Sequence, residues 1–232
     1  MKTIKIGWCL DRDEASAVYY DPEPTSSLTD RFVKDAGVGS CPAVRDFENQ
    51  TFTVKSPFTF RLRAVQDGDE ISFHPVYPFT QIEESLIQNL LLFQPKRLWR
   101  NPKYPVLQLN LPYVFVADES VLINQIEPTK VLGGKNWSLI QGRFDIYAWH
   151  RPLNWAIEWT NIKDDLIVRR GQPLFQLIFQ ANEFNANFAL SQIERTIEIE
   201  RAIAATKNVT GVMKGTKKIM LDQAKKNREP FL

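Results

Sequence analysis

The stretches Arg143-Phe-Asp-Ile-Tyr-Ala-Trp149 and Asn154-Trp-Ala-Ile-Glu-Trp-Thr160 carry the clearest fold information in the sequence. Side chains alternate along both stretches with a period of two, which is typical of half-buried β-strands. In the second stretch the alternation places two tryptophans on one face and Glu158 on the other. We therefore predict two strands, joined as a hairpin by the loop 150–153, with Trp155 and Trp159 buried.

The same alternation recurs on both sides of this pair. It predicts further strands at 51–55, 58–63, 70–74, 106–111, 113–117, 166–168 and 174–179. Prolines interrupt most of the chain up to residue 173 and leave few gaps for a long helix. One gap, 80–93, has apolar residues at helical spacing and predicts a short helix there, with a buried strand at 86–93 as the alternative.

The chemistry of the chain changes after Ala181. Ser191-Gln-Ile-Glu194 has the spacing of a capping box, so we predict a helix of about 15 residues from this point. Residues 207–232 contain seven lysines and arginines and two acidic residues, a net charge of +5. The sequence thus predicts a mainly β body at 1–181, a sandwich, jelly-roll or β-clip-like fold, and a C-terminal helix with a basic tail at 182–232.

Composition narrows the class of protein. The 232 residues are 44% hydrophobic and 24% charged, with a net charge of +2, which is typical of a globular chain and shows no chain-wide basic field. No apolar run is long enough for a membrane helix, and acidic residues from Asp11 onward argue against a secretory signal. We expect a cytoplasmic protein, in the host cytoplasm or the virion if the source is viral, with no membrane partner.

No metal centre or cofactor is expected. Cys9, Cys41, His74 and His150 are each separated by more than 30 residues, which fits no zinc module. The acidic residues between 11 and 30 lack the spacing and the glycine of a calcium-binding loop.

Residues 139–180 contain three short motifs in order. They are Gly142-Arg-Phe-Asp145, Ile157-Glu-Trp-Thr-Asn161 and Gly171-Gln-Pro-Leu-Phe-Gln-Leu-Ile-Phe179. This segment resembles the dUTPase and dCTP deaminase superfamily, whose fold is a β-clip. The resemblance implies that Glu158 occupies the general acid/base position of the deaminases. It also implies that Asp145 occupies the acidic position that helps to activate water in dUTPases.

Two parts of that family's pattern have no counterpart here. A glycine turn follows the aspartate in the family and brings the backbone close to the sugar, which only glycine allows. An Arg-Ser-Ser segment binds phosphate in the family, and this sequence has none. The sequence therefore favours a protein without catalytic activity, and a nucleotide-handling hydrolase or deaminase is the alternative.

Two other groups of residues are candidates for binding. Aromatic and basic side chains gather around the loop 150–153 and can stack on a base or a sugar. These candidate ligand-binding residues are Tyr147, Trp149, His150 and Arg151. In the tail, lysines alternate with apolar residues, which suits contact with a partner. The candidate partner-binding residues are Lys214, Lys217, Lys218, Lys225 and Lys226.

These features predict a non-enzymatic binding or assembly protein that docks through its C-terminal helix and basic tail. Its composition, with many Asn, Trp and Tyr residues, resembles that of phage proteins. We expect a protein partner or self-association into a homo-oligomer, and the charge of the tail would also suit nucleic acid.

Overall fold

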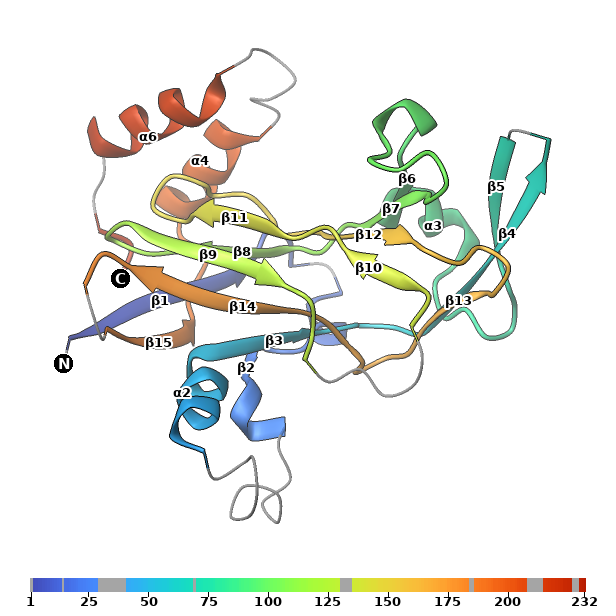
Figure 1. The fold of residues 1–232 in the computed structure, drawn as a ribbon. Coiled ribbons are helices and arrows are strands. Elements are labelled where there is room, and N and C mark those ends of the chain that lie inside the picture. The colour runs from blue at the N-terminus through green and yellow to red at the C-terminus, as the bar shows by residue number, and fades with distance from the viewer. Residues whose placement is uncertain are drawn as a thin grey trace.

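The computed structural model describes residues 2–13, 15–28, 41–68, 70–129, 135–183, 186–207, 215–226 and 230–232 (Figure 1). Within these ranges the chain is mainly β, as the sequence predicts. Its strands form four hydrogen-bonded sheets. Helices lie at the periphery of the strands in Figure 1.

The longest strand, β14, is the central strand of a five-stranded sheet that runs through the middle of the molecule. Its strand order is β11-β9-β14-β3-β2, and neighbouring strands are antiparallel. The strands are β11 (Gly142–Asp145), β9 (Val121–Ile126), β14 (Pro173–Ala181), β3 (Thr51–Lys55) and β2 (Glu23–Pro24). Side chains on both faces of the central strand β14 are buried, which indicates that both faces of the sheet are covered at this strand.

Two further sheets lie against it. A three-stranded sheet has the order β15-β1-β8, with β15 (Asn187–Gln192), β1 (Thr3–Leu10) and β8 (Tyr113–Val116). A four-stranded sheet has the order β10-β12-β7-β6, with β10 (Trp137–Leu139), β12 (Trp155–Trp159), β7 (Val106–Leu109) and β6 (Leu91–Phe93).

The fourth sheet projects from one end of the molecule. It has the order β13-β4-β5, with β13 (Leu166–Val168), β4 (Phe60–Asp67) and β5 (Glu70–Pro75). Strand β13 pairs with only the first three residues of β4, so the rest of β4 and β5 extend as a two-stranded hairpin. Figure 1 shows this hairpin at the far end from the C-terminal helices.

The helices of the described chain are short. They are α2 (Pro42–Gln50), α3 (Glu84–Leu90), α4 (Ile197–Thr206) and α6 (Thr216–Lys226), with 3-10 turns η1 (Ser16–Val18), η2 (Thr25–Leu28) and η4 (Lys96–Leu98). The predicted helix in 80–93 is confirmed as α3. The alternative strand is also present in part, because Leu91–Phe93 forms β6 directly after the helix.

The predicted capping box at Ser191 is wrong. Ser191 lies in β15, where it pairs with Gly7 of β1 in parallel register. The helix begins later, at Ile197, and the hydroxyl of Thr196 accepts a hydrogen bond from the amide of Ile199. Residues 187–192 form a strand instead of a helix start, because β1 would otherwise leave a row of backbone groups unpaired.

The predicted hairpin between residues 143 and 160 is also wrong. Strand β11 pairs with β9, whereas β12 pairs with β7 and β10 in another sheet. The chain leaves β11 at Asp145, whose carbonyl oxygen accepts hydrogen bonds from the amides of Ala148 and Trp149. That turn ends the strand earlier than the alternation predicts, since the amides of the turn are no longer available for a strand partner.

The core continues across the sheets without a break. Trp155 and Trp159 are fully buried, as predicted. Trp155 packs edge-on against Trp137 at 5.0 Å between ring centroids, and Trp159 stacks on Phe73 at 5.6 Å. Aromatic contacts therefore tie β12 both to its own sheet and to the projecting hairpin.

Candidate functional site

Glu158 is held by an arginine that lies 58 residues earlier in the chain. Arg100 donates from Nε to Oε1 of Glu158 at 3.0 Å and from Nη2 to Oε2 at 2.8 Å. This bidentate geometry is the strongest form of an arginine–carboxylate pair. The Glu158 side chain is 11% exposed and the Arg100 side chain 63% exposed, so the pair lies at the edge of the core with its guanidinium reaching into solvent.

The pairing decides the charge of Glu158. Hydrogen bonds from Arg100 lower the pKa of the carboxyl below its usual value, and this outweighs desolvation, which raises it. A general acid needs a proton to give near neutral pH, which calls for a raised pKa. Glu158 has the opposite shift, and both of its oxygens are occupied by Arg100.

The ion pair makes a prediction about stability and pH. The pKa of Glu158 is lower in the folded chain than its reference value of 4.5, so the pair stabilises the fold fully above about pH 4.5. This contribution begins to decrease as the pH approaches that value, and it is lost as the pH falls through the lower pKa of the folded chain, where the carboxylate gains a proton. We expect Glu158→Gln to cost about 1 kcal/mol at pH 7, since solvent around Arg100 weakens the pair, and progressively less at lower pH.

Urea unfolding of both proteins between pH 7 and pH 3 measures this difference. Glu183→Gln is the matched control, because Glu183 is exposed and its carboxylate lies 3.5 Å from Lys2. The control should change stability by much less at every pH. A cost of Glu158→Gln that stays constant down to pH 3 would contradict the assignment.

Asp145 lies in a different sheet from Glu158 and has a structural role in its own turn. Its Oδ1 accepts a hydrogen bond from the amide of Tyr147 at 3.1 Å, and Oδ2 accepts one from the hydroxyl of Ser120 at 3.0 Å. This is the arrangement of an aspartate that stabilises a tight turn. Glu158 is opposite Ser138 of β10 and Val106 of β7, whereas Asp145 is opposite Leu122 of β9.

The candidate ligand-binding residues around the loop 150–153 divide into two environments. Tyr147 and Trp149 are half-buried, and the guanidinium of Arg151 lies over the Trp149 ring at 5.1 Å. His150 is buried instead, and its ring meets that of Phe231 edge-on at 5.4 Å. The structure thus brings Trp149 and Arg151 together and turns His150 toward the C-terminus of the chain.

The candidate partner-binding lysines are described only in part. Lys218 lies on α6 and is exposed. The whole of Lys214, and the side chains of Lys217, Lys225 and Lys226, lie outside the described residues.

The described residues contain no cluster of three or more histidine, cysteine or acidic side chains that would suit a metal ion. Two of the acidic residues near the N-terminus have basic partners: Asp13 pairs with Arg195 at 2.7 Å, and Glu23 pairs with Lys55. Cys9 is buried, and burial raises the pKa of its thiol to about 11, which keeps it protonated at neutral pH.

Sequence patterns missed Arg100. It belongs to a run of four basic residues between 96 and 103, and no acidic residue occurs from 85 to 117. Such a run lacks a local counter-charge, so one of its members is a candidate for pairing with a distant carboxylate. The pattern gives no indication of which carboxylate that is.

Comparison with known proteins gives a structural likeness only. No family model matches the chain, and no curated protein matches it. Among solved structures, the chain is similar to a variant of the dUTPase from phage phi11 of Staphylococcus aureus, with a TM-score of 0.41, 10% sequence identity, and coverage of 83% of this chain and 98% of that one. It is also similar to the dUTPase of Staphylococcus bacteriophage 80alpha, with a TM-score of 0.39, 10% identity, and coverage of 78% and 98%. Both of these neighbours are dUTPases. No helix among the described residues has the length and apolar character needed to cross a membrane.

Proposed function

We propose that this protein is a non-enzymatic binding or assembly protein that docks an acidic protein partner through its C-terminal helices and basic segment. The observation that carries this proposal is the anchoring of the C-terminal region to the β body at both of its ends. A tail that only added solubility would not need such anchoring.

The first anchor is helix α4. Ile199 is buried against Cys9, Val114 and Val116 on the face of the β1–β8 pair. At the end of the same helix, the hydroxyl of Thr206 donates to the carbonyl oxygen of His150 at 2.9 Å. Burial of Ile199 and this hydrogen bond fix the orientation of α4.

The second anchor is the last few residues of the chain. The carboxylate of Asp118 accepts hydrogen bonds from the amides of Phe231 at 2.7 Å and Leu232 at 3.0 Å. Gly7 on β1 makes room for this contact, because a Cβ at that position would lie 2.8 Å from Leu232 Cδ2 and 2.6 Å from Ile193 Cδ1. The segment between the anchors therefore starts and ends on the body.

The anchored segment leaves a mixed surface in solvent. Ile197 of α4 and Ile219 of α6 are exposed, and exposed Lys218 is next to Ile219. Exposed apolar side chains beside lysines suit a protein surface with an acidic rim. The occupied oxygens of Glu158 and Asp145 support a role without hydrolysis.

Binding to fluorescein-labelled polyglutamate tests the proposal. We expect saturable, salt-sensitive binding by the full chain, because the lysines release counterions when they meet a polyanion. Charge reversal of Lys217, Lys218, Lys225 and Lys226 to glutamate should reduce the affinity at least tenfold. Reversal of Lys103 and Lys163, which are exposed and lie outside the C-terminal region, is the control and should leave the affinity unchanged.

Two outcomes would overturn the proposal. One is tighter binding of a DNA duplex than of polyglutamate at equal salt, which would make the partner a nucleic acid. The other is hydrolysis or deamination of dUTP or dCTP with Mg²⁺ present, accompanied by a rise in melting temperature of several degrees. Loss of that activity in Asp145→Asn or Glu158→Gln would establish the enzymatic alternative.

A further inference from the structure

The free edge of the β4–β5 hairpin has features of a self-association surface. Its register runs from Leu62 opposite Pro75 to Asp67 opposite Glu70, without a bulge. Strand β13 covers β4 only as far as Leu62. From residue 63 to 67, β4 therefore has β5 on one side and no other strand of the described chain on the opposite side, where Figure 1 shows it outermost.

Hydrogen bonding within the hairpin determines which residues face outward. The amide of Val76 donates to the carbonyl oxygen of Arg61 at 2.8 Å. Because backbone groups alternate in direction along an antiparallel strand, Arg63 and Val65 direct theirs toward β5. Ala64 and Gln66 direct their N–H and C=O groups away from β5, so they form an open edge two residues long.

This part of β4 lacks a proline, a lysine and a bulge, and its two charged residues, Arg63 and Asp67, have opposite signs. Natural edge strands are commonly protected by proline, lysine or a bulge. Residues 63–67 contain no proline and no lysine, and their pairing with β5 is regular. Val65, at the centre, is 46% exposed although it is a β-branched apolar residue.

The charges of the hairpin are arranged to match a second, antiparallel copy. At the tip, Asp67 and Glu70 are directly opposite each other, which is unfavourable within one chain. At the base, Arg61 and Arg63 share the carboxylate of Asp165, with donor–acceptor distances of 2.6 Å from Arg61 and 3.0 Å from Arg63. The tip is therefore acidic, and the base keeps an excess positive charge.

We propose that two copies of this chain associate by antiparallel pairing of β4 with β4, about a two-fold axis at Val65. In this register Ala64 of one copy and Gln66 of the other exchange backbone hydrogen bonds. Val65 meets Val65 of the second copy, and Arg63 lies opposite Asp67 of the second copy. The two hairpins then form one four-stranded sheet with the order β5-β4-β4-β5.

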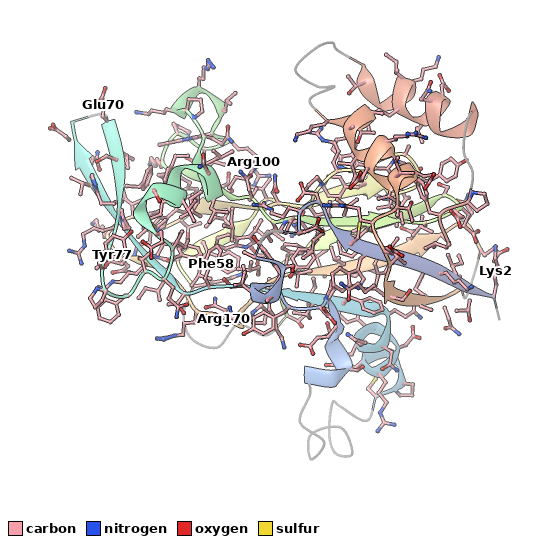
Figure 2. All side chains as sticks on the ribbon, turned by 180° about the vertical axis from the view of Figure 1, so that it is seen from behind. Lys2, Phe58, Glu70, Tyr77, Arg100 and Arg170 are labelled. Atoms are coloured by element: carbon pink, nitrogen blue, oxygen red, sulfur yellow. The ribbon has the colours of Figure 1, made fainter. Side chains whose placement is uncertain are left out.

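The pairing satisfies all three features of the edge at once. It fills the outward hydrogen-bonding groups, buries the exposed valine and places the acidic tip of each hairpin against the basic base of the other. The surface lies at the opposite end of the molecule from Lys2, as Figure 2 shows for Glu70 and Lys2, and it is separate from the C-terminal helices. The proposal therefore goes beyond the docking function and does not depend on it.

Sedimentation equilibrium of the full chain tests the proposal. Two short strands bury less than the roughly 1,200 Å² of a standard interface, so we expect weak association, visible at about 0.1–1 mM protein. The mass should rise from 26.8 kDa toward twice that value with concentration. A chain that stays monomeric over this range would overturn the proposal.

Three variants locate the contact. Ala64→Pro removes an outward N–H group without removing a bond to β5, so it should give a folded monomer. Asp67→Arg should also be monomeric, because Arg63 of one copy would face the new arginine of the other copy. Glu183→Arg, with the same charge change at the other end of the molecule, is the control and should still associate.

The charge pairing is tested by a mixture of two variants. Arg63→Asp should be monomeric alone and should form a heterodimer when mixed with Asp67→Arg. Association that survives Ala64→Pro, or a mixture that stays monomeric while both variants are folded by circular dichroism, would place the contact elsewhere.

Discussion

Replacing Trp159 with alanine is expected to lower the free energy of unfolding by about 3–5 kcal/mol. The indole is fully buried, stacks on Phe73 and donates from Nε1 to the carbonyl oxygen of Asn161 at 2.9 Å. Its removal leaves a cavity between β12 and the projecting hairpin, and leaves that carbonyl with only the longer hydrogen bond from Nδ2 of Asn136 at 3.3 Å. Urea unfolding followed by circular dichroism measures the loss.

Trp149→Ala is the matched control for this prediction. Trp149 is half-buried, with Arg151 over one face of its ring and Phe144 5.6 Å away. Its replacement should cost about 1 kcal/mol, because much of the ring already contacts solvent. A loss below about 1 kcal/mol for Trp159→Ala itself would show that the tryptophan face of β12 is not part of the core.

Truncation after Ala181 is expected to abolish the cooperative unfolding transition. It removes β15, which pairs with six consecutive residues of β1, from Thr3 to Trp8. It also removes Ile199, which buries Cys9 on the same strand. Strand β1 would keep only β8 as a neighbour, and a fold that is marginally stable rarely survives the loss of an entire strand and its covering helix.

Truncation after Thr206 is the informative comparison. It keeps β15 and α4 and removes α6 with Phe231 and Leu232. We expect this shorter chain to unfold cooperatively at a lower temperature, because the two hydrogen bonds to Asp118 and the contact of Phe231 with His150 are lost. A cooperative transition in the chain that ends at Ala181 would instead support the division at that residue predicted from composition.

Glu158, one of the candidate catalytic residues, shows what a local sequence pattern can and cannot predict. The alternation in 154–160 correctly placed Glu158 on the face opposite the two tryptophans. A half-buried strand would leave that face in solvent, whereas the structure shows Glu158 buried and paired. The pairing arises because β6, η4 and β7 carry Arg100 to the same edge of the sheet, and an arrangement over 58 residues leaves no trace in the pattern around Glu158.

The sequence alone determined that several segments are extended and that the tryptophan face of β12 is buried, whereas β1, β9 and β15 were not predicted. The pleat imposes a period of two on any half-buried strand, so residues 166–168 and 174–179 were recognisable as strands, as was the buried face of Trp155 and Trp159. The helix at 84–90 was also recognisable, because its apolar residues recur at helical spacing and this spacing is a local property of the sequence.

Only the tertiary structure decided which strands are neighbours. Strands β11 and β12 are close in sequence but join different sheets, and β1 finds its partner β15 about 180 residues later. Strand partners depend on burial and hydrogen bonding over the whole chain. The entropic cost of closing the loop between two strands grows only slowly with loop length, so a distant partner is not excluded. For that reason the local helix signal at Ser191 gave way to a strand, and the charges of the β4 edge became a matched surface only once the hairpin was formed.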